Sequence, residues 1–239
     1  MRETQYEQAV TLLPVIDLQD GLVVAARAGE RERYAPIHSP LVAGSAPEDV
    51  LAALLQRTGG HAAYLADLDA IRRQRPQIAG LRALLARFPG LTLWLDGGFR
   101  SADEGLAICA SVASGGAAWV RPVLGTETLT ARAALGEPPL RDACALSLDF
   151  GPEGFRGDPH WLSQPQDWPA SVIVMTLARV GLAQGPDLER LRQVRQLAAG
   201  RQVFAAGGVR DAQDVEALAR IGVSGALVAS ALHLGTLPR

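Results

Sequence analysis

The chain of 239 residues contains no lysine, so all 23 of its Lys and Arg positions are arginine. The absence of lysine excludes a Schiff-base lysine mechanism and a P-loop lysine, because both need an ε-amino group. With 25 acidic residues the net charge is only −2, which gives no general attraction to nucleic acid or to anionic membranes. We therefore expect neither nucleic acid nor a membrane as a partner.

Cysteine and long apolar runs are also scarce. The two cysteines, Cys109 and Cys144, form no pair motif, which is typical of a reduced cytoplasmic protein. The longest apolar runs have the length of strands, far short of the roughly 20 residues that span a bilayer. The polar N-terminal segment MRETQYEQ does not have the pattern of a signal peptide. The histidines have no metal-ligand spacing, so we expect no metal site.

Two segments of the chain repeat one pattern. Residues 93–108 read LWLDGGFRSADEGLAI, and residues 203–218 read VFAAGGVRDAQDVEAL. Each contains an apolar strand, a Gly-Gly turn and a helix with apolar spacing. A single repeat at about half the chain length indicates a duplicated half rather than a solenoid array. We place the two halves at about residues 1–135 and 136–239.

Short apolar segments alternate with helical patterns along the whole chain. Near-continuous apolar runs, typical of parallel strands buried on both faces, occupy residues 12–18, 62–68, 91–97, 117–123, 143–150, 171–177, 201–207 and 225–229. Helical patterns occupy residues 47–57, 76–88, 101–111, 126–135, 186–198 and 211–220. The alternation predicts an α/β fold, a single (β/α)8 TIM barrel over residues 1–239 with an internal half-barrel duplication. An open doubly wound sheet is the alternative, which the half-repeat disfavours.

Candidate catalytic residues lie at the strand ends, because a barrel of this kind carries its chemistry at the C-terminal ends of its strands. Asp17 ends the first predicted strand and Asp149 ends the fifth, so their carboxylates should face each other across the mouth. Two carboxylates in different environments can act as general acid and general base. An aspartate at a strand end can also simply cap a turn. Thr176, at the end of the sixth strand, is the third candidate.

Candidate phosphate-binding residues follow the third, fourth, seventh and eighth strands. Glycines between a strand and a helix let backbone N–H groups approach a phosphate, and the helix dipole favours its charge. Glycine also suits any tight turn, but the repetition favours a ligand with a phosphate at each end. The residues assigned to this role are Gly97, Gly98, Gly125, Thr126, Gly207, Gly208, Ala229 and Ser230.

The chain resembles a known family in the segments VIDLQDGLVV, YLADLDAI, LWLDGGFRSADE, VLGTETL, FAAGGVRDAQDVEAL and GVSGALVASAL. These segments are similar to the paired histidine-biosynthesis barrels. The pair consists of ProFAR isomerase (phosphoribosylformimino-aminoimidazole carboxamide ribotide isomerase) and the cyclase subunit of imidazole glycerol phosphate synthase. The resemblance covers essentially the whole chain and implies a ligand with two phosphates and no metal or organic cofactor. The cyclase carries a lysine in its strand-1 region that this chain lacks, so the isomerase is the nearer relative.

The resemblance also implies roles for individual residues. Asp17 matches the family's general base, and Asp149 matches a carboxylate assigned as acid or as substrate holder. The implied reaction is an Amadori rearrangement of an aminoaldose to an aminoketose on a phosphorylated small molecule. The chain departs from the pattern after its sixth strand, where Val180 stands in place of an aspartate that is a candidate acid. Because valine cannot donate a proton, we expect weak or absent ProFAR isomerisation.

Two other functions remain open. Isomerase-like proteins of this kind are associated with one-carbon cofactor biosynthesis of the methanopterin or methylofuran type, and the chain can be a divergent paralogue with a different reaction. A barrel that binds a phosphate ligand without turnover is the non-enzyme alternative, and Asp17 and Asp149 argue against it because a pure binder has little use for two carboxylates near an anion. A monomer and a small homo-oligomer are both compatible with the sequence.

Overall fold

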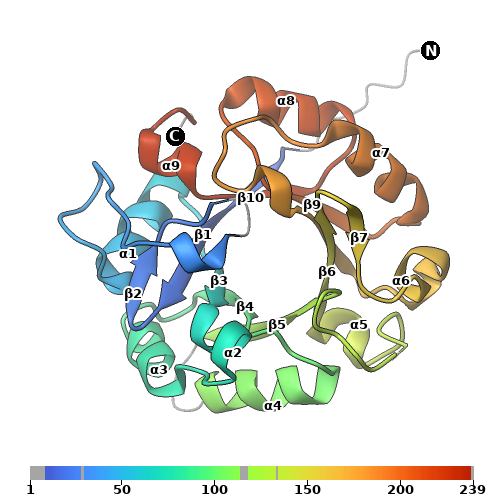
Figure 1. The fold of residues 1–239 in the computed structure, drawn as a ribbon, viewed down its shortest axis with the longest axis horizontal. Coiled ribbons are helices and arrows are strands. Elements are labelled where there is room, and N and C mark those ends of the chain that lie inside the picture. The colour runs from blue at the N-terminus through green and yellow to red at the C-terminus, as the bar shows by residue number, and fades with distance from the viewer. Residues whose placement is uncertain (1–8, 28–29, 114–117, 133, 238–239) are drawn as a thin grey trace.

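The computed structural model describes residues 9–27, 30–113, 118–132 and 134–237. Within these ranges eight parallel strands close into a barrel, because β1 pairs with β3 on one side and with β10 on the other (Figure 1). In ring order the strands are β1 (Thr11–Gln19), β3 (Ala62–Asp67), β4 (Thr92–Asp96), β5 (Trp119–Gly125), β6 (Ala145–Gly151), β8 (Ser171–Thr176), β9 (Gln202–Ala206) and β10 (Gly225–Val228). The predicted (β/α)8 barrel is confirmed.

Helices form the outer layer around the strands (Figure 1). The longer helices are α1 (Pro47–Thr58), α3 (Ile78–Ala86), α4 (Ala102–Ala113), α7 (Leu188–Leu197) and α8 (Ala212–Arg220). The shorter ones are α2 (Leu68–Arg73), α5 (Leu140–Ala143), α6 (His160–Ser163) and α9 (Ser230–Leu234), with single 3-10 turns η1 (Arg31–Arg33), η2 (Pro165–Asp167) and η3 (Leu177–Arg179). In the described part of the chain, no helix combines the length and apolarity needed to cross a membrane.

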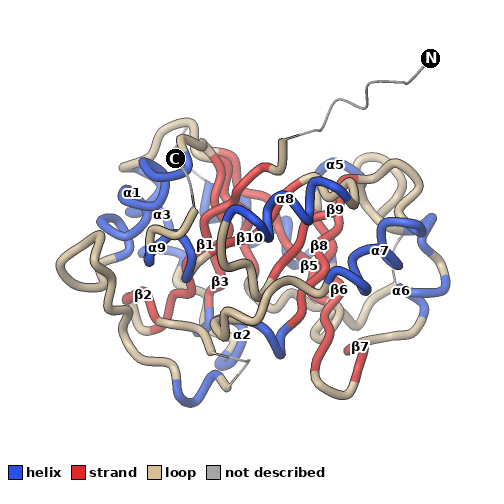
Figure 2. Tube along the Cα trace, turned by 90° about the horizontal axis from the view of Figure 1, so that it is seen from above, coloured by secondary structure: helices blue, strands red, loops and turns tan. Residues whose placement is uncertain are grey.

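Two short antiparallel strands extend the barrel at equivalent places. β2 (Leu22–Val24) folds back on β1, and β7 (Gly154–Arg156) folds back on β6. In the first hairpin Asp17 is opposite Val24, and in the second Asp149 is opposite Arg156, so both have the same spacing. Figure 2 shows β2 and β7 toward the same end of the barrel. The matched hairpins support the predicted half-barrel duplication; the boundary between residues 135 and 136 stays a prediction.

Alternating side chains of the strands build two apolar cores. Inward-facing residues fill the barrel, where Trp94 of β4 and Phe204 of β9 meet edge to face with ring centroids 4.9 Å apart. Outward-facing residues pack against the helices in a larger cluster that includes Leu54, Leu93 and Val203. Strands that are apolar on both faces are typical of a parallel sheet covered by helices. The interior around this aromatic pair is apolar, whereas Asp17 and Asp96 lie toward the C-terminal ends of their strands.

One predicted helix is absent. Residues 126–132 and 134–135, which were expected to belong to a helix over 126–135, form a turn at 126–128 followed by irregular loop. The N–H groups of Thr130 and Ala131 donate to the carbonyl of Arg100 at 3.1 and 3.2 Å. These donors are therefore used by the loop after β4 instead of by a helix. The helical prediction for this segment was wrong because a distant carbonyl competes successfully for its backbone groups.

Candidate functional site

A cavity of about 610 Å³ lies at the C-terminal ends of the barrel strands. Residues from every barrel strand or from the loop after it line this cavity. They include eight of the residues predicted from the sequence, namely Asp17, Gly98, Gly125, Asp149, Gly207, Gly208, Ala229 and Ser230. Gly97, Thr126 and Thr176 are not among the described residues that line it. Thr176 is buried, and its chain neighbours Met175 and Leu177 contribute to the wall instead.

Asp149 is a buried carboxyl group of the site with a raised pKa. Its side chain is 5% exposed and accepts hydrogen bonds from the Ser147 hydroxyl at 2.7 Å and from the Glu127 N–H at 3.1 Å. Burial raises the pKa of Asp149 to about 7, against the lowering effect of these two donors; the negative charges of Glu127 and Asp96 raise it further. A carboxyl group with this pKa exchanges its proton near neutral pH, as a general acid requires.

Asp17 occupies the equivalent place in the other half of the barrel. It lies on β1, which is four strands away from β6 in the ring, so Asp17 and Asp149 come from opposite sides of the mouth. Asp17 is partly exposed, whereas Asp149 is buried. The sequence prediction that two carboxylates in different environments share this site therefore agrees with their placement.

Tyr64 and Asp96 form a polar pair that sequence reasoning did not assign to the site. The Tyr64 hydroxyl donates to Asp96 Oδ2 at 2.8 Å, and the N–H of Gly98 donates to Asp96 Oδ1 at 2.9 Å. Both side chains line the cavity. Burial raises the pKa of Tyr64 well above its usual value, and the charges of Asp96, Asp17 and Asp149 add to the effect. The sequence feature that could have predicted Asp96 as a site residue is its position directly before the first Gly-Gly turn.

The first predicted phosphate turn already uses its backbone donors within the protein. The N–H of Gly98 donates to Asp96, and the N–H of Thr126 donates to the carbonyl of Ser147 at 2.9 Å. Thr126 is 1% exposed, and its Oγ1 accepts the N–H of Asp149 at 3.0 Å. Asp96 and Asp149 therefore surround this turn with carboxyl groups. A phosphate can bind here only if these amides change their acceptors.

The second predicted phosphate turn is built differently. Gly207 and Gly208 have φ angles of 100° and 91°, in the left-handed region that favours glycine. A Cβ on Gly208 would lie 2.3 Å from the carbonyl oxygen of Gly185. The N–H of Gly185 in turn donates to the carbonyl of Gly208 at 3.0 Å. The close approach of two backbones holds the turn rigidly beside the cavity and explains why the sequence needs glycine here.

Arginines that follow the two Gly-Gly turns have matching structural roles. The N–H of Arg100 donates to Glu104 at 2.7 Å, and the N–H of Arg210 donates to Asp214 at 2.9 Å, each four residues ahead on the following helix. The Arg210 guanidinium also binds Asp214 through Nε and Nη2, both at 2.8 Å. The hydrogen bonds and the negative charge of Asp214 raise the pKa of Arg210 above the usual value. The repeated arrangement is further support for duplication and fixes the start of α8.

Val180 lies at the cavity wall, in the loop between β8 and α7. A Cβ on Gly207 would lie 3.5 Å from Val180 Cγ2, so the isopropyl group is next to the second glycine turn. Arg179 holds the same loop by donating to the carbonyls of Gly185 and Pro186 at 3.0 and 2.8 Å. An apolar group therefore occupies the position where the resemblance led us to look for a proton donor.

Fold and site together define a half-duplicated (β/α)8 barrel with a carboxylate-bearing cavity at its mouth. A family model described as "Histidine biosynthesis protein" matches residues 160–238. The chain is 30% identical to the phosphoribosyl imidazole-4-carboxamide isomerase of Symbiobacterium thermophilum, with 95% of this chain and 92% of the relative covered. It is 32% identical to phosphoribosyl isomerase A of Streptomyces coelicolor, with 93% and 92% covered. An uncharacterized protein of Methanocaldococcus jannaschii is 27% identical, with 95% and 94% covered.

Identities of this size over nearly complete chains show to which family the chain belongs. The chain belongs to the histidine-biosynthesis barrel family, as its sequence motifs led us to expect.

Proposed function

We propose that this barrel is an isomerase that acts on a phosphorylated small molecule by general acid–base catalysis of the aldose–ketose type. The observation that carries the proposal is the buried Asp149, with a pKa of about 7, across the mouth from the more exposed Asp17. Two carboxyl groups whose environments separate their proton affinities are suited to the acid and base roles of one reaction. The relatives are named as isomerases, which supports the isomerase part of the proposal.

The proposed reaction divides its proton transfers between these two groups. Asp149, in its protonated form, donates to the ring oxygen of an aminoaldose and opens the ring. Asp17 then removes the proton from C2, which gives an enolamine. Asp17 returns this proton to C1 while the C2 hydroxyl gives its proton to Asp149, which yields the aminoketose and restores both groups. Each such general acid–base step contributes typically about 10²–10⁴-fold to the rate. Asp149 takes the acid role because Val180 supplies no proton at the neighbouring position.

The phosphate of the ligand is proposed to bind at the second glycine turn. Gly207, Gly208, Ala229 and Ser230 line the cavity. The first N–H groups of a helix have no acceptor within that helix, and Ser230 is the first residue of α9. A second phosphate at Gly98, Gly125 and Thr126 remains part of the proposal, and its binding requires the Gly98 and Thr126 amides to exchange their present acceptors.

An assay with purified protein and ProFAR tests the reaction. We expect turnover well below the roughly 1–10 s⁻¹ of an ordinary enzyme, because Val180 replaces the expected acid. Val180→Asp should raise that turnover at least about 10-fold, and Val180→Asn, which has the same shape without the acid, is the matched control. Ordinary turnover by the unmodified protein would show that Asp149 is a sufficient acid. An absence of turnover in both the unmodified protein and Val180→Asp would refute ProFAR as substrate.

A divergent paralogue in one-carbon cofactor biosynthesis is the second candidate. The position of Val180 at the cavity wall favours this candidate. The glycine turns match the family pattern, but an apolar residue replaces the expected acid between them, and this combination suits a different substrate. Under this candidate the Val180→Asp variant also fails with ProFAR, while phosphate still binds at the second turn. A phosphate-binding barrel without catalysis predicts phosphate binding at this turn and no turnover in either the unmodified protein or the Val180→Asp variant.

A further inference from the structure

His233 on α9 presents an unusual buried nitrogen. Its side chain is 6% exposed and lines the cavity, and its Nδ1 lies 2.8 Å from the hydroxyl oxygen of Ser39. Within the described residues, Nε2 is buried and has no hydrogen-bond partner. A buried polar group without a partner is unfavourable. Such a nitrogen at a cavity wall is the feature expected of a group that a ligand completes.

The contacts of Ser39 indicate which ring nitrogen carries the proton. The N–H of Leu41 donates to Ser39 Oγ at 3.1 Å, which leaves the hydroxyl proton free to be donated to Nδ1 of His233. A ring that accepts at Nδ1 carries its proton on Nε2 when it is neutral. Burial lowers the pKa of His233 below its usual value, which favours the neutral ring. In the tautomer in which Ser39 donates to Nδ1, Nε2–H is a hydrogen-bond donor that has no acceptor among the described residues.

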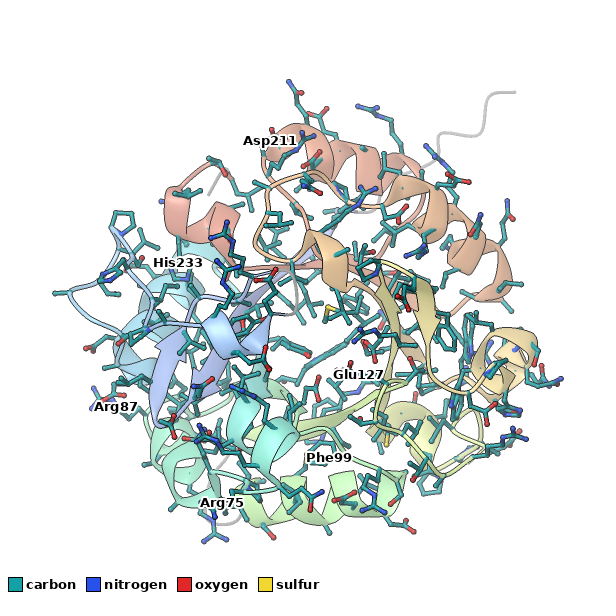
Figure 3. All side chains as sticks on the ribbon, in the orientation of Figure 1. Arg75, Arg87, Phe99, Glu127, Asp211 and His233 are labelled. Carbon is teal, nitrogen blue, oxygen red and sulfur yellow. The ribbon has the colours of Figure 1, made fainter. Side chains whose placement is uncertain are left out.

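The position of His233 relates this donor to the second glycine turn. His233 follows Ser230 by three residues in α9, and residues three apart are neighbours on one face of a helix. Ser230, Ala231 and Gly208 line the same cavity. Figure 3 shows His233 and Glu127 on opposite sides of the barrel. The phosphate proposed at Ser230 and Gly208 is accordingly expected on the His233 side of the mouth, which it shares with Asp17 of the adjacent strand β1.

We propose that the Nε2–H of His233 binds an anionic oxygen of the ligand, namely the phosphate at the second glycine turn, and that Ser39 is a positioning residue that fixes the ring. The proposal rests on the proposed function, because it deepens the description of that phosphate site. Ser39 lies in the segment between β2 and α1, so its contact with His233 connects this segment with α9.

Titration of inorganic phosphate into the full-length, ¹⁵N-labelled protein tests the proposal. In spectra that detect histidine ring nitrogens, the Nε2–H signal of His233 should shift with phosphate and saturate, and His233→Phe identifies it by its loss. We expect His233→Phe to weaken phosphate binding about 10-fold or more. His233→Gln should stay within about 3-fold, because its side-chain amide supplies a donor. His61→Phe, an exposed histidine at the start of β3, is the control and should change nothing.

Ser39→Ala examines the positioning role. Without the hydroxyl, Nδ1 loses its donor, and the pattern of ring-nitrogen signals should change toward a mixture of tautomers. Phosphate binding should weaken a few-fold, with His233 still present. A merely structural His233 predicts the opposite result: lower thermal stability in His233→Phe with phosphate affinity kept.

A further variant distinguishes the role of His233 from the existence of the phosphate site. Ser230→Asp places a negative charge at the first position of α9, where it is tolerated by the helix dipole but repels phosphate. Binding that is lost in Ser230→Asp and unchanged in His233→Phe would overturn the role of His233 and keep the site. An absence of phosphate binding in the unmodified protein would overturn both.

Discussion

The hydroxyl of Tyr64 on β3 donates a 2.8 Å hydrogen bond to Oδ2 of Asp96 on the neighbouring strand β4. The second carboxylate oxygen of Asp96 accepts the N–H of Gly98, so two donors fix the orientation of this group at the cavity wall. The charge of Asp96 is one of the causes that raise the pKa of Asp149. A pair between adjacent strands therefore influences the proton affinity of a carboxyl group two strands further around the barrel.

A double-mutant cycle measures the strength of this pair. Tyr64→Phe and Asp96→Asn should each lower the free energy of unfolding, and their coupling should be about 1.5–3 kcal/mol, the range for a hydrogen bond to a charged group. Urea unfolding of the single and double variants gives the coupling directly. A coupling near zero would mean that the two groups contribute independently and that the hydrogen bond is weak in solution.

Asp149 should make stability depend on pH in a specific window. The pKa of Asp149 is about 7 in the folded protein, against an ordinary value of 3.8. The unfolded chain therefore loses this proton from about pH 4 upward, while the folded protein keeps it until about pH 7. The contribution of Asp149 to the free energy of unfolding is therefore fully present below pH 4 and is lost as the pH rises to about 7. The loss is at most about 1.4 kcal/mol per pH unit.

Asp149→Asn, which cannot titrate, should remove this part of the pH dependence. We expect the variant to gain stability relative to the unmodified protein as the pH rises from about 5 to 8, and to lose catalytic activity. Urea unfolding of both proteins at several pH values gives the difference, in which the other titrating groups cancel. A constant difference between the two proteins across this range would contradict the raised pKa of Asp149.

Asp17→Asn separates a catalytic role from a turn-capping role. The substitution keeps the shape of the side chain and removes its basicity. If Asp17 is the general base, kcat should fall at least about 10²-fold, while phosphate binding and thermal stability are nearly unchanged. A capping aspartate predicts lost stability with activity kept in the folded fraction. Turnover and melting temperature of this one variant, measured with a substrate that the protein accepts, decide between the two roles.

Gly208→Ala tests the close backbone approach at the second glycine turn. The new Cβ would lie 2.3 Å from the carbonyl oxygen of Gly185, at a φ of 91° that alanine adopts poorly. We expect a loss of stability of about 1–3 kcal/mol together with weaker phosphate binding. Gly200→Ala is the matched control, since Gly200 also has a positive φ of 85° but no neighbour within 4 Å of the added atom. Equal effects at both positions would show that backbone strain alone is responsible.

Much of this architecture was predictable because it depends on local patterns. Short apolar runs predicted each barrel strand to within two residues at either end, as for residues 171–177 against Ser171–Thr176. Asp17 and Asp149 were placed at the mouth because the ends of parallel strands share one edge of the sheet. The helix predicted over residues 126–135 failed for the converse reason, since its backbone donors bind the distant carbonyl of Arg100.

The sequence by itself determined the order of strands, the glycine turns and the two facing aspartates, because chain neighbours decide periodicity and turn geometry. Only the tertiary structure decided how these groups behave. The pKa of Asp149 depends mainly on burial, and the pair of Tyr64 and Asp96 depends on the register of β3 and β4. Ser39 and His233 are 194 residues apart and meet because β10 closes the ring against β1. Burial and proximity between distant segments arise only when the barrel closes, and no local pattern encodes them.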